Sequence, residues 1–350
     1  LLQPVRPAPR HGLDMTTPSP ARPLAACPIC GSAGVGLYEA LTDRLAGTPG
    51  TWRMARCPEP TCGLLWLDPA PDAETLVRAY AGYHTHTPPP GRSRPAAAVR
   101  RWLKEGHYSL RFGYPVRRAW PKRALALALL ARPRLREGLD RLVMYLPPQR
   151  DGRVVDVGCG SGTTLDQLRG LGWRTEGVDF DPMAVAAASS RGLDVRLGSL
   201  QDQHYPERSV DAVTMSHVIE HVPDPVGLLR ECRRVLKPDG RLVVVTPNAA
   251  SLGHLRFGMD WRGLEPPRHL QVFTAPSWKR ALALAGLRPA TLRTSASGAA
   301  FYHAGSRRGP GDGPAARQDA AARRFEREER RWLADHPWAG EELVSVATPA

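Results

Sequence analysis

The sequence predicts an α/β fold in which helices flank a doubly wound, mostly parallel sheet, with a smaller module in front of it. Three observations lead to this prediction. An apolar run at residues 154–157 meets a turn with glycine at every second position, Gly158, Gly160 and Gly162. A second strand-like run, residues 174–179, ends in an acidic residue. Strand-like and helix-like segments then alternate over about 100 residues, which is typical of a parallel sheet.

The glycine turn predicts a ligand site. Glycine permits backbone angles and close approaches that a Cβ would forbid, and the N–H groups at the start of the next helix can face a ligand. The order is D-x-G-x-G-x-G from Asp156, not the G-x-G-x-x-G of dinucleotide-binding proteins. It therefore indicates a small, zwitterionic nucleoside and not a pyrophosphate. Asp179, at the tip of the second strand, is suited to accept both ribose hydroxyls.

The remainder of residues 151–350 continues the alternation. A third strand is expected just before Gly198, and the later strands at residues 210–215, 241–246, 287–295 and 340–347. Helices are expected at residues 225–235 and 275–286, with a turn at residues 236–240. A helical insertion is expected over residues 310–338, made of a flexible link and a charged helix. These elements give the predicted sheet both its strands and its crossover helices.

Four segments of the chain are VDVGCGSGTTL, GVDFDP, SVDAVTMSHVIEHV and VLKPDGRLVVVTPN. In their order and spacing the chain resembles the class I S-adenosylmethionine (SAM)-dependent methyltransferases. The resemblance implies a Rossmann-like, seven-stranded, mostly parallel sheet over residues 151–350, and an enzyme that uses SAM. It also implies the cofactor contacts. These are Asp156, Gly158, Cys159, Gly160 and Gly162 in the glycine turn, Asp179 and Phe180 at the ribose and adenine, and Ser199, Leu200 and Ser216 nearby.

Four of the six cysteines predict a metal site. They form a C-x₂-C pair and a C-x₄-C pair, each followed by glycine: Cys27, Cys30, Cys57 and Cys62. Four thiolates in two such turns suit tetrahedral, structural Zn²⁺, and unbound or redox-active cysteines are the alternative. We therefore predict a zinc ribbon over residues 25–68. The segment that follows resembles a subgroup of the methyltransferases that carries an N-terminal zinc ribbon, several of which act on sugars or glycan precursors.

The net charge of +14 is concentrated in one stretch. Residues 91–150 contain 15 Lys or Arg and 3 Asp or Glu, a balance of +12, whereas residues 151–250 contain 11 and 14, a balance of −3. We predict a basic helical cap or linker over residues 69–150. Aromatic residues interleaved with arginine suit a phosphate-bearing acceptor such as RNA, a nucleotide-sugar or a lipid-linked intermediate. The alternative is a set of solvated arginines whose neighbouring aromatics pack on the core.

We next consider what the sequence indicates about membrane insertion and cellular location. No apolar run approaches the roughly 18–20 residues of a membrane span. Residues 1–24 are rich in proline and arginine and have no apolar periodicity, so we expect a disordered extension there. They also lack the apolar core of a signal peptide. A cytoplasmic location is therefore expected.

The segment after the fourth predicted strand contains the first candidates for catalysis. A helical turn would project His217, Glu220 and His221 to one side, at the ligand edge of the sheet. Imidazole titrates near neutrality and can take a proton from a hydroxyl, so His217 and His221 are candidate bases; the alternative is that they brace the next loop. Small-RNA 2′-O-methyltransferases and ubiquinone-pathway O-methyltransferases resemble this turn but carry E-x-x-E-H, which holds a divalent metal. A metal at Glu220, His221 and His269, with His217, is therefore a further alternative.

A proline-rich segment follows the fifth predicted strand, within a lid expected over residues 249–275. It resembles the W-x-x-L-x-x-P-R-H-x-x-x-F-T segment of the zinc-ribbon subgroup, and proline makes a loop the expected conformation. In a doubly wound methyltransferase the segment after the fifth strand closes over the acceptor pocket. The resemblance makes Trp261, Arg268 and His269 the expected acceptor contacts, with His269 a third candidate base. The alternative is that Arg268 and His269 pin the lid to the core.

Taken together, these features predict an enzyme that methylates oxygen on a sugar, a glycan precursor or a specialised metabolite. The acceptor would be a small molecule or glycan, phosphate-bearing or lipid-linked. One alternative is an RNA methyltransferase acting on ribosomal or transfer RNA. The other is a non-catalytic SAM-binding scaffold that contacts RNA or a membrane. The shared motifs concern the cofactor, and no sequence feature identifies the acceptor atom or the oligomeric state.

Overall fold

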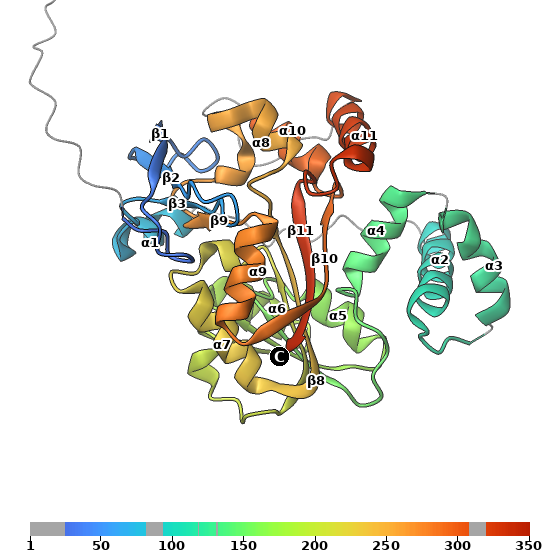
Figure 1. The fold of residues 1–350 in the computed structure, drawn as a ribbon. Helices are drawn as coiled ribbons and strands as arrows, with labels where there is room; N and C mark the ends of the chain where they lie inside the picture. The colour runs from blue at the N-terminus through green and yellow to red at the C-terminus, as the bar shows by residue number, and fades with distance from the viewer. Residues whose placement is uncertain (1–24, 82–93, 118, 131, 308–319) are drawn as a thin grey trace, which may run out of the picture.

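The computed structural model describes residues 25–81, 94–117, 119–130, 132–307 and 320–350. It contains a large seven-stranded sheet and a small four-stranded sheet (Figure 1). The predicted disordered extension, residues 1–24, and the first part of the predicted insertion lie outside the described residues. No helix among the described residues is long and apolar enough to cross a membrane.

The large sheet is doubly wound and seven-stranded, as predicted, and its strand order is β10-β11-β8-β7-β4-β5-β6. The strands are β4 (Arg153–Val157), β5 (Arg174–Asp179), β6 (Asp194–Leu197), β7 (Val210–Ser216), β8 (Leu236–Pro247), β10 (Leu287–Ser295) and β11 (Glu342–Pro349). Strands β4 to β8 pair in parallel, and β11 pairs antiparallel with both β8 and β10. The predicted fold class is therefore confirmed, including the final antiparallel strand.

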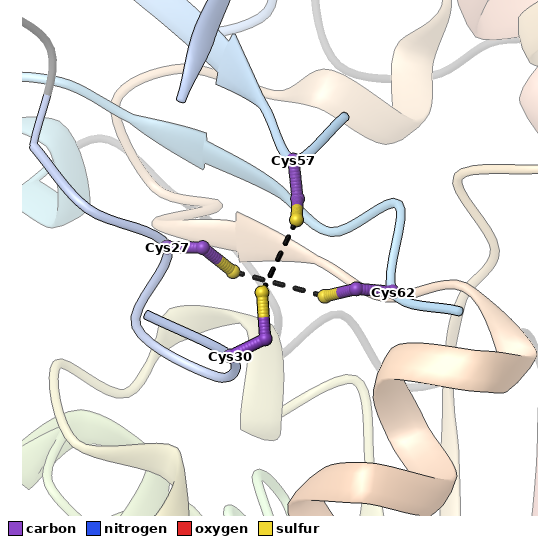
Figure 2. Close-up of side chains that lie close together, drawn as sticks. All are labelled: Cys27, Cys30, Cys57 and Cys62. Atoms are coloured by element: carbon purple, nitrogen blue, oxygen red, sulfur yellow. Dashed lines mark hydrogen bonds between the residues drawn. The ribbon is translucent and has the colours of Figure 1, made fainter. Parts of the chain in front are cut away.

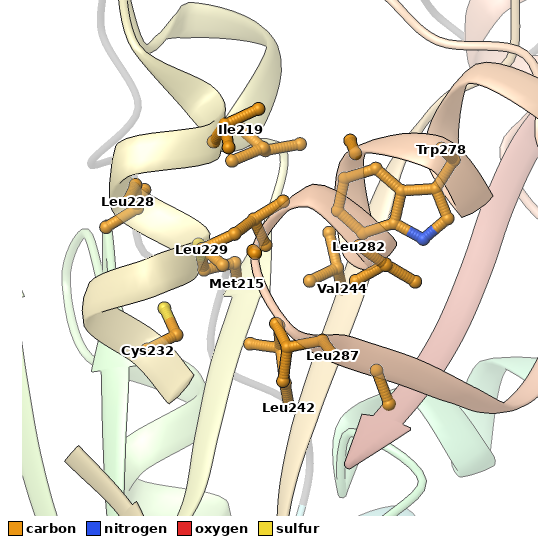
Figure 3. Packing of buried hydrophobic residues seen from close by; sticks show 14 of the residues in the cluster. Met215, Ile219, Leu228, Leu229, Cys232, Leu242, Val244, Trp278, Leu282 and Leu287 are labelled. Atoms are coloured by element: carbon orange, nitrogen blue, oxygen red, sulfur yellow. The ribbon is translucent and has the colours of Figure 1, made fainter. Parts of the chain in front are cut away.

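Both faces of this sheet are covered, because successive side chains on a strand point to opposite faces. Leu242 and Val244 of β8 pack on one face with α7 (Pro225–Val235) and α9 (Ala275–Leu284), as Figure 3 shows. Val243 and Val245 face the other side and pack with Leu168 of α5 (Thr163–Arg169) and with Val143 and Met144, which follow α4 (Pro133–Leu142). α6 (Pro182–Ser189) lies along β5 and β6. This double coverage explains the continuous apolar runs in the strands.

The small sheet joins the N-terminal region to the lid. Its order is β1-β2-β3-β9, with β1 (Val35–Leu41), β2 (Trp52–Arg56) and β3 (Leu65–Leu67) from the region of the predicted ribbon and β9 (Gln271–Val272) from the lid. The sequence predicted only a loop at β9. The short strand forms because Leu65 and Trp66 of β3 offer it an antiparallel partner, a contact that local proline content does not reveal.

Two further segments differ from the sequence prediction. Residues 236–240, where a turn was predicted, belong to β8. In the pairing of β7 with β8, Val210 lies opposite Leu236, but Ala212 lies opposite Arg241. The residues of β8 between these two pairs therefore form a bulge. The predicted helical turn at residues 217–221 is a short 3₁₀ helix, Ile219–His221, and His217 lies before it with a left-handed φ of 57°. The lid similarly contains α8 (Leu252–Phe257) and short 3₁₀ turns.

The remaining helices lie around the two sheets (Figure 1). α1 (Ala73–Ala81) follows β3, and α2 (Arg94–Phe112) and α3 (Ala119–Leu130) pack against each other in the predicted basic region. α10 (Ala299–Ser306) packs on α11 (Ala320–Asp335), where the sequence predicted a charged helix. On α2, the imidazole of His107 lies 2.7 Å from the carboxylate of Asp140 on α4, and both side chains are buried.

A fully buried ion pair fastens the N-terminal region to the lid. The two terminal nitrogens of Arg268 each lie 2.8 Å from an oxygen of Asp43, and neither side chain has any exposed surface. Arg268 also donates to the Glu265 carboxylate and to the backbone carbonyl of Ala79. Arg268 holds the pKa of the Asp43 carboxyl well below its usual range, although burial acts in the opposite direction.

Asp43→Asn should lower the free energy of unfolding by about 3 kcal/mol, because it leaves part of the Arg268 charge buried without its partner. Urea titration followed by circular dichroism measures the change. Asp260→Asn is the matched control, since it breaks the exposed pair between Arg44 and Asp260 and should cost less than about 1 kcal/mol. Equal losses in the two variants would contradict a stabilising role for the buried pair.

Candidate functional site

The glycine turn lies where β4 ends and α5 begins. Gly158 and Gly162 have φ values of 67° and 77°, in the left-handed region that other residues rarely adopt. A Cβ on Gly158 would meet Val218 at 2.4 Å, and one on Gly162 would meet Leu193 at 2.3 Å. The chain must therefore carry glycine at both positions to make this turn. The Cβ position of Gly160, in contrast, faces open space.

Two carboxylates lie beside the turn in different surroundings. Asp179 ends β5, and its oxygens accept the backbone N–H of Gly160 at 2.8 Å and that of Asp181 at 2.9 Å. Asp156 lies within β4, where it accepts the Thr214 hydroxyl at 2.6 Å. Burial raises the pKa of Asp156 to about 7, and the nearby Asp179 charge adds to this rise. Asp179 therefore lies against the glycine turn, and Asp156 is buried beneath it.

The other predicted cofactor residues lie around this edge. Phe180 is exposed and meets the Tyr80 ring edge-on, with ring centroids 5.3 Å apart. Ser199 is exposed and bonds to Asp202, whereas Leu200 is buried. Cys159 is buried beside Leu165 and Leu193, and the Ser216 hydroxyl accepts a hydrogen bond from Arg141.

His217 lies between two buried carboxylates. Its Nδ1 is 3.2 Å from Glu220 and its Nε2 is 3.0 Å from Glu342 of β11. Burial opposes its protonation, but the two hydrogen bonds outweigh burial and raise the pKa of His217 to about 9. The ring is therefore an imidazolium at neutral pH, with both nitrogens donating. It has no lone pair with which to take a proton from an acceptor.

His221 and His269 form a second, separate pair. Their rings meet nearly edge to face, with centroids 4.6 Å apart. The Nδ1 of His221 is 3.0 Å from the carbonyl oxygen of Arg268, and the Nδ1 of His269 is 2.8 Å from that of Gly263. Carbonyls only accept hydrogen bonds, so each Nδ1 donates, and the lone pair of the neutral form of either ring lies on Nε2. Burial, together with the nearby His269, lowers the pKa of His221 to about 4, so His221 is neutral at pH 7.

Tyr80, which the sequence analysis did not single out, contacts this pair. Its hydroxyl is 2.8 Å from the Nδ1 of His221, and its ring stands beside Phe180. It reaches the site from the last turn of α1, which the Arg268 contact with Ala79 holds in place. The only signal in the sequence was a tyrosine within the predicted helical cap or linker.

Contacts between the lid and the histidine segment fix this geometry. The backbone N–H of Leu270 donates to the Glu220 carbonyl at 2.8 Å, and the Gln271 amide donates to the carbonyls of Ile219 and Val222. Trp261 is buried, stacks on His254 and bonds to Glu341. Of the three predicted acceptor contacts, Trp261 and Arg268 are thus held by other side chains, and His269 lies beside another candidate base.

Glu220, His221 and His269 each offer one ligand atom within 4.8 Å of the others. Both carboxylate oxygens of Glu220 are engaged, one with His217 and one with the Thr246 hydroxyl. A metal at this cluster would have to compete with these two contacts.

The four ribbon cysteines converge on one point, as Figure 2 shows. Their sulfur atoms all lie within 4.8 Å of one another, with 3.7 Å between Cys27 and Cys62 and 3.3 Å between Cys30 and Cys57. Tetrahedral zinc–sulfur bonds place sulfurs about 3.8 Å apart. Burial opposes ionisation of Cys30, but hydrogen bonds with Ser32 lower its pKa to about 6. The arrangement therefore suits a four-thiolate metal site.

Comparisons with known proteins agree with this geometry. A family model described as a methyltransferase domain matches residues 130–292. The ubiquinone biosynthesis O-methyltransferase of Xanthomonas oryzae pv. oryzae is 40% identical over 103 residues, which cover 27% of this chain and 43% of that protein. A probable SAM-dependent methyltransferase of Mycolicibacterium smegmatis is 39% identical over 97 residues, covering 27% of this chain and 38% of that protein. The chain thus spans about two fifths of the length of these curated relatives.

Among solved structures, the geranyl diphosphate C-methyltransferase of Streptomyces coelicolor A3(2) superposes with a TM-score of 0.47 at 19% identity, covering 79% of this chain and 98% of that one. A possible histamine N-methyltransferase of Thermotoga maritima superposes with a TM-score of 0.42 at 20% identity, over 73% and 97% of the two chains. Residues 130–292 of this chain match a methyltransferase domain, and the curated relatives it resembles include a probable SAM-dependent methyltransferase.

Proposed function

We propose that this chain transfers a methyl group from SAM to a hydroxyl oxygen of a sugar, a glycan precursor or a specialised metabolite. The observation that carries the proposal is the pair His221 and His269, two imidazoles that share one site and whose Nδ1 atoms both contact backbone carbonyls, which leaves each Nε2 to face an acceptor. A hydroxyl acceptor must lose a proton during methylation, and a neutral imidazole can take it. A curated relative that is named as an O-methyltransferase supports oxygen as the acceptor atom.

The glycine turn and Asp179 are the residues that would hold SAM. Positive φ angles keep the turn free of side chains, and Gly160 leaves open space on its Cβ side. Asp179 retains further lone pairs for ribose hydroxyls, since each of its oxygens accepts only one of the backbone bonds above. Bound SAM supplies a methyl group already activated by its positively charged sulfur.

The chain's own contribution to the chemistry is proton transfer and alignment. In our proposal the Nε2 of His269 or His221 accepts the hydroxyl proton as the acceptor oxygen bonds to the methyl carbon and the carbon–sulfur bond breaks. Tyr80 and the Arg268 carbonyl orient His221, and the Gly263 carbonyl orients His269. His217 would act differently, as a fixed positive charge that keeps Glu220 and Glu342 in place.

We further propose that Cys27, Cys30, Cys57 and Cys62 bind one structural Zn²⁺. All four positions of a tetrahedral ion would be filled by thiolates, so the ion would have no open position for a substrate. Its effect would be to tie the turn at residues 27–30 to the turn at residues 57–62, which leads from β2 to β3.

S-adenosylhomocysteine should bind the wild-type protein, and Asp179→Ala should remove most of that affinity because the ribose hydroxyls lose their acceptor. Isothermal titration calorimetry measures both. Asp194→Ala, an exposed carboxylate on β6, is the control and should bind like the wild type. Undiminished affinity in Asp179→Ala would overturn the ribose assignment.

The purified protein should contain about one zinc ion per chain, measured by elemental analysis. The double variant Cys27→Ser/Cys30→Ser should lose it, because two of the four ligands are gone, and its melting temperature should fall. Cys232→Ala is the control, since Cys232 is buried in α7 away from the cluster. A metal-free wild type, or full zinc content in the double variant, would refute the zinc proposal.

Incubation with methyl-labelled SAM and source-cell extract should place label in the small polar or lipid-linked sugar fraction. Asp179→Ala serves as the blank. His269→Asn should retain S-adenosylhomocysteine affinity and lose roughly a hundredfold in labelling rate, since it removes a candidate base and not a cofactor contact. Label in the RNA fraction would favour an RNA methyltransferase instead, and no label in any fraction would favour a SAM-binding scaffold.

A further inference from the structure

Helix α3 buries a lysine and exposes several large apolar side chains. Lys122 is only 7% exposed, whereas Trp120 is 81% exposed, the highest value among the large apolar side chains that the structure describes. Leu127 is 53% exposed and Leu125 is 46% exposed. At 3.6 residues per turn, Trp120, Ala124 and Leu127 lie on one face, which we call the outer face of α3. The exposed Arg123 lies at the edge of this face, and Leu125 lies about 100° round the helix from Ala124.

The contacts with α2 explain why α3 is held in this orientation. Lys122 pairs with Glu105 and lies 5.4 Å above the Trp102 ring. A Cβ on Gly106 would meet the Lys122 backbone at 2.0 Å and Ala126 at 3.2 Å, so the two helices approach closely at this glycine. Rotating α3 to bury Trp120 against α2 would break the Lys122 contacts and this close approach. The outer face therefore stays apolar and exposed.

The surroundings of this face are strongly basic. Residues 94–130 contain nine Lys or Arg and one Glu, a balance of +8. Arg100, Arg101, Arg111, Arg117 and Arg123 are exposed among them. Figure 1 places α2 and α3 at the edge of the molecule, on the side away from the small sheet. A surface of this kind can approach a flat partner without obstruction from the rest of the protein.

We propose that the outer face of α3 docks on an anionic lipid bilayer. Tryptophan and leucine enter the boundary between headgroups and acyl chains, and flanking cations attract anionic headgroups. The positive charge of the region favours an anionic bilayer over a second copy of the chain. A second copy would bring two basic surfaces together, and these would repel each other. RNA would satisfy the cations but would leave Leu125 and Leu127 without an apolar partner. This docking is independent of the proposed methyl transfer and is tested by binding alone.

Vesicle co-sedimentation tests the proposal on the full chain. The protein should bind vesicles of phosphatidylcholine with phosphatidylserine, bind phosphatidylcholine vesicles much less, and dissociate as salt rises. Trp120→Ser/Leu127→Ser should weaken binding about tenfold. The emission of Trp120, obtained as the difference from Trp120→Phe, should shift to shorter wavelength on binding.

Leu255→Ser is the matched control, because Leu255 on α8 is 76% exposed and lies outside the basic region. It should bind like the wild type, and thermal unfolding verifies that every variant is folded. Equal binding by the double variant and the control would overturn the proposal. So would a double variant that changes only self-association, measured by sedimentation equilibrium, or only RNA binding, measured by fluorescence anisotropy.

Discussion

The buried pair of Asp43 and Arg268 is the contact on which the geometry of the candidate site depends. Burying a charged side chain away from water is costly unless an opposite charge pairs with it. The bidentate contact between the Arg268 guanidinium and the Asp43 carboxylate provides that pairing. The pair holds the N-terminal region against the lid, next to His269, and β3 pairs with β9 at the same place. The small sheet therefore contains a strand of the lid and is not an independent appendage.

Sequence patterns were sufficient to predict features that depend on residues close together in the chain. The glycine turn could be predicted because its backbone angles exclude other residues at Gly158 and Gly162. Asp179 could be predicted because a parallel strand ends at a known edge of the sheet. The four cysteines form two short motifs, and only the approach of the two motifs required the fold. Local stereochemistry accounts for each of these predictions.

Features made by distant residues could not be predicted in this way. Tyr80 meets His221 across 141 positions, and Glu342 meets His217 across 125. Trp261 and Arg268 stood in a segment expected to contact the acceptor, yet their polar atoms are held by Glu341 and Asp43. Strand β9 exists because β3 is adjacent to it. The basic region was evident from composition, but which of its residues face outward depends on how α2 and α3 pack.

The three histidines show why residue type alone leaves the mechanism open. In the sequence, His217, His221 and His269 are equivalent candidates with the same ordinary pKa. Two carboxylates hold His217 as a cation, whereas burial keeps His221 neutral. A base needs a free lone pair as well as a suitable pKa, and the carbonyl contacts place the lone pair of the neutral ring on Nε2 in both His221 and His269. The division of roles follows from the hydrogen-bond partners, so that changing a partner such as Glu342 would change the chemistry of a histidine that itself remained in place.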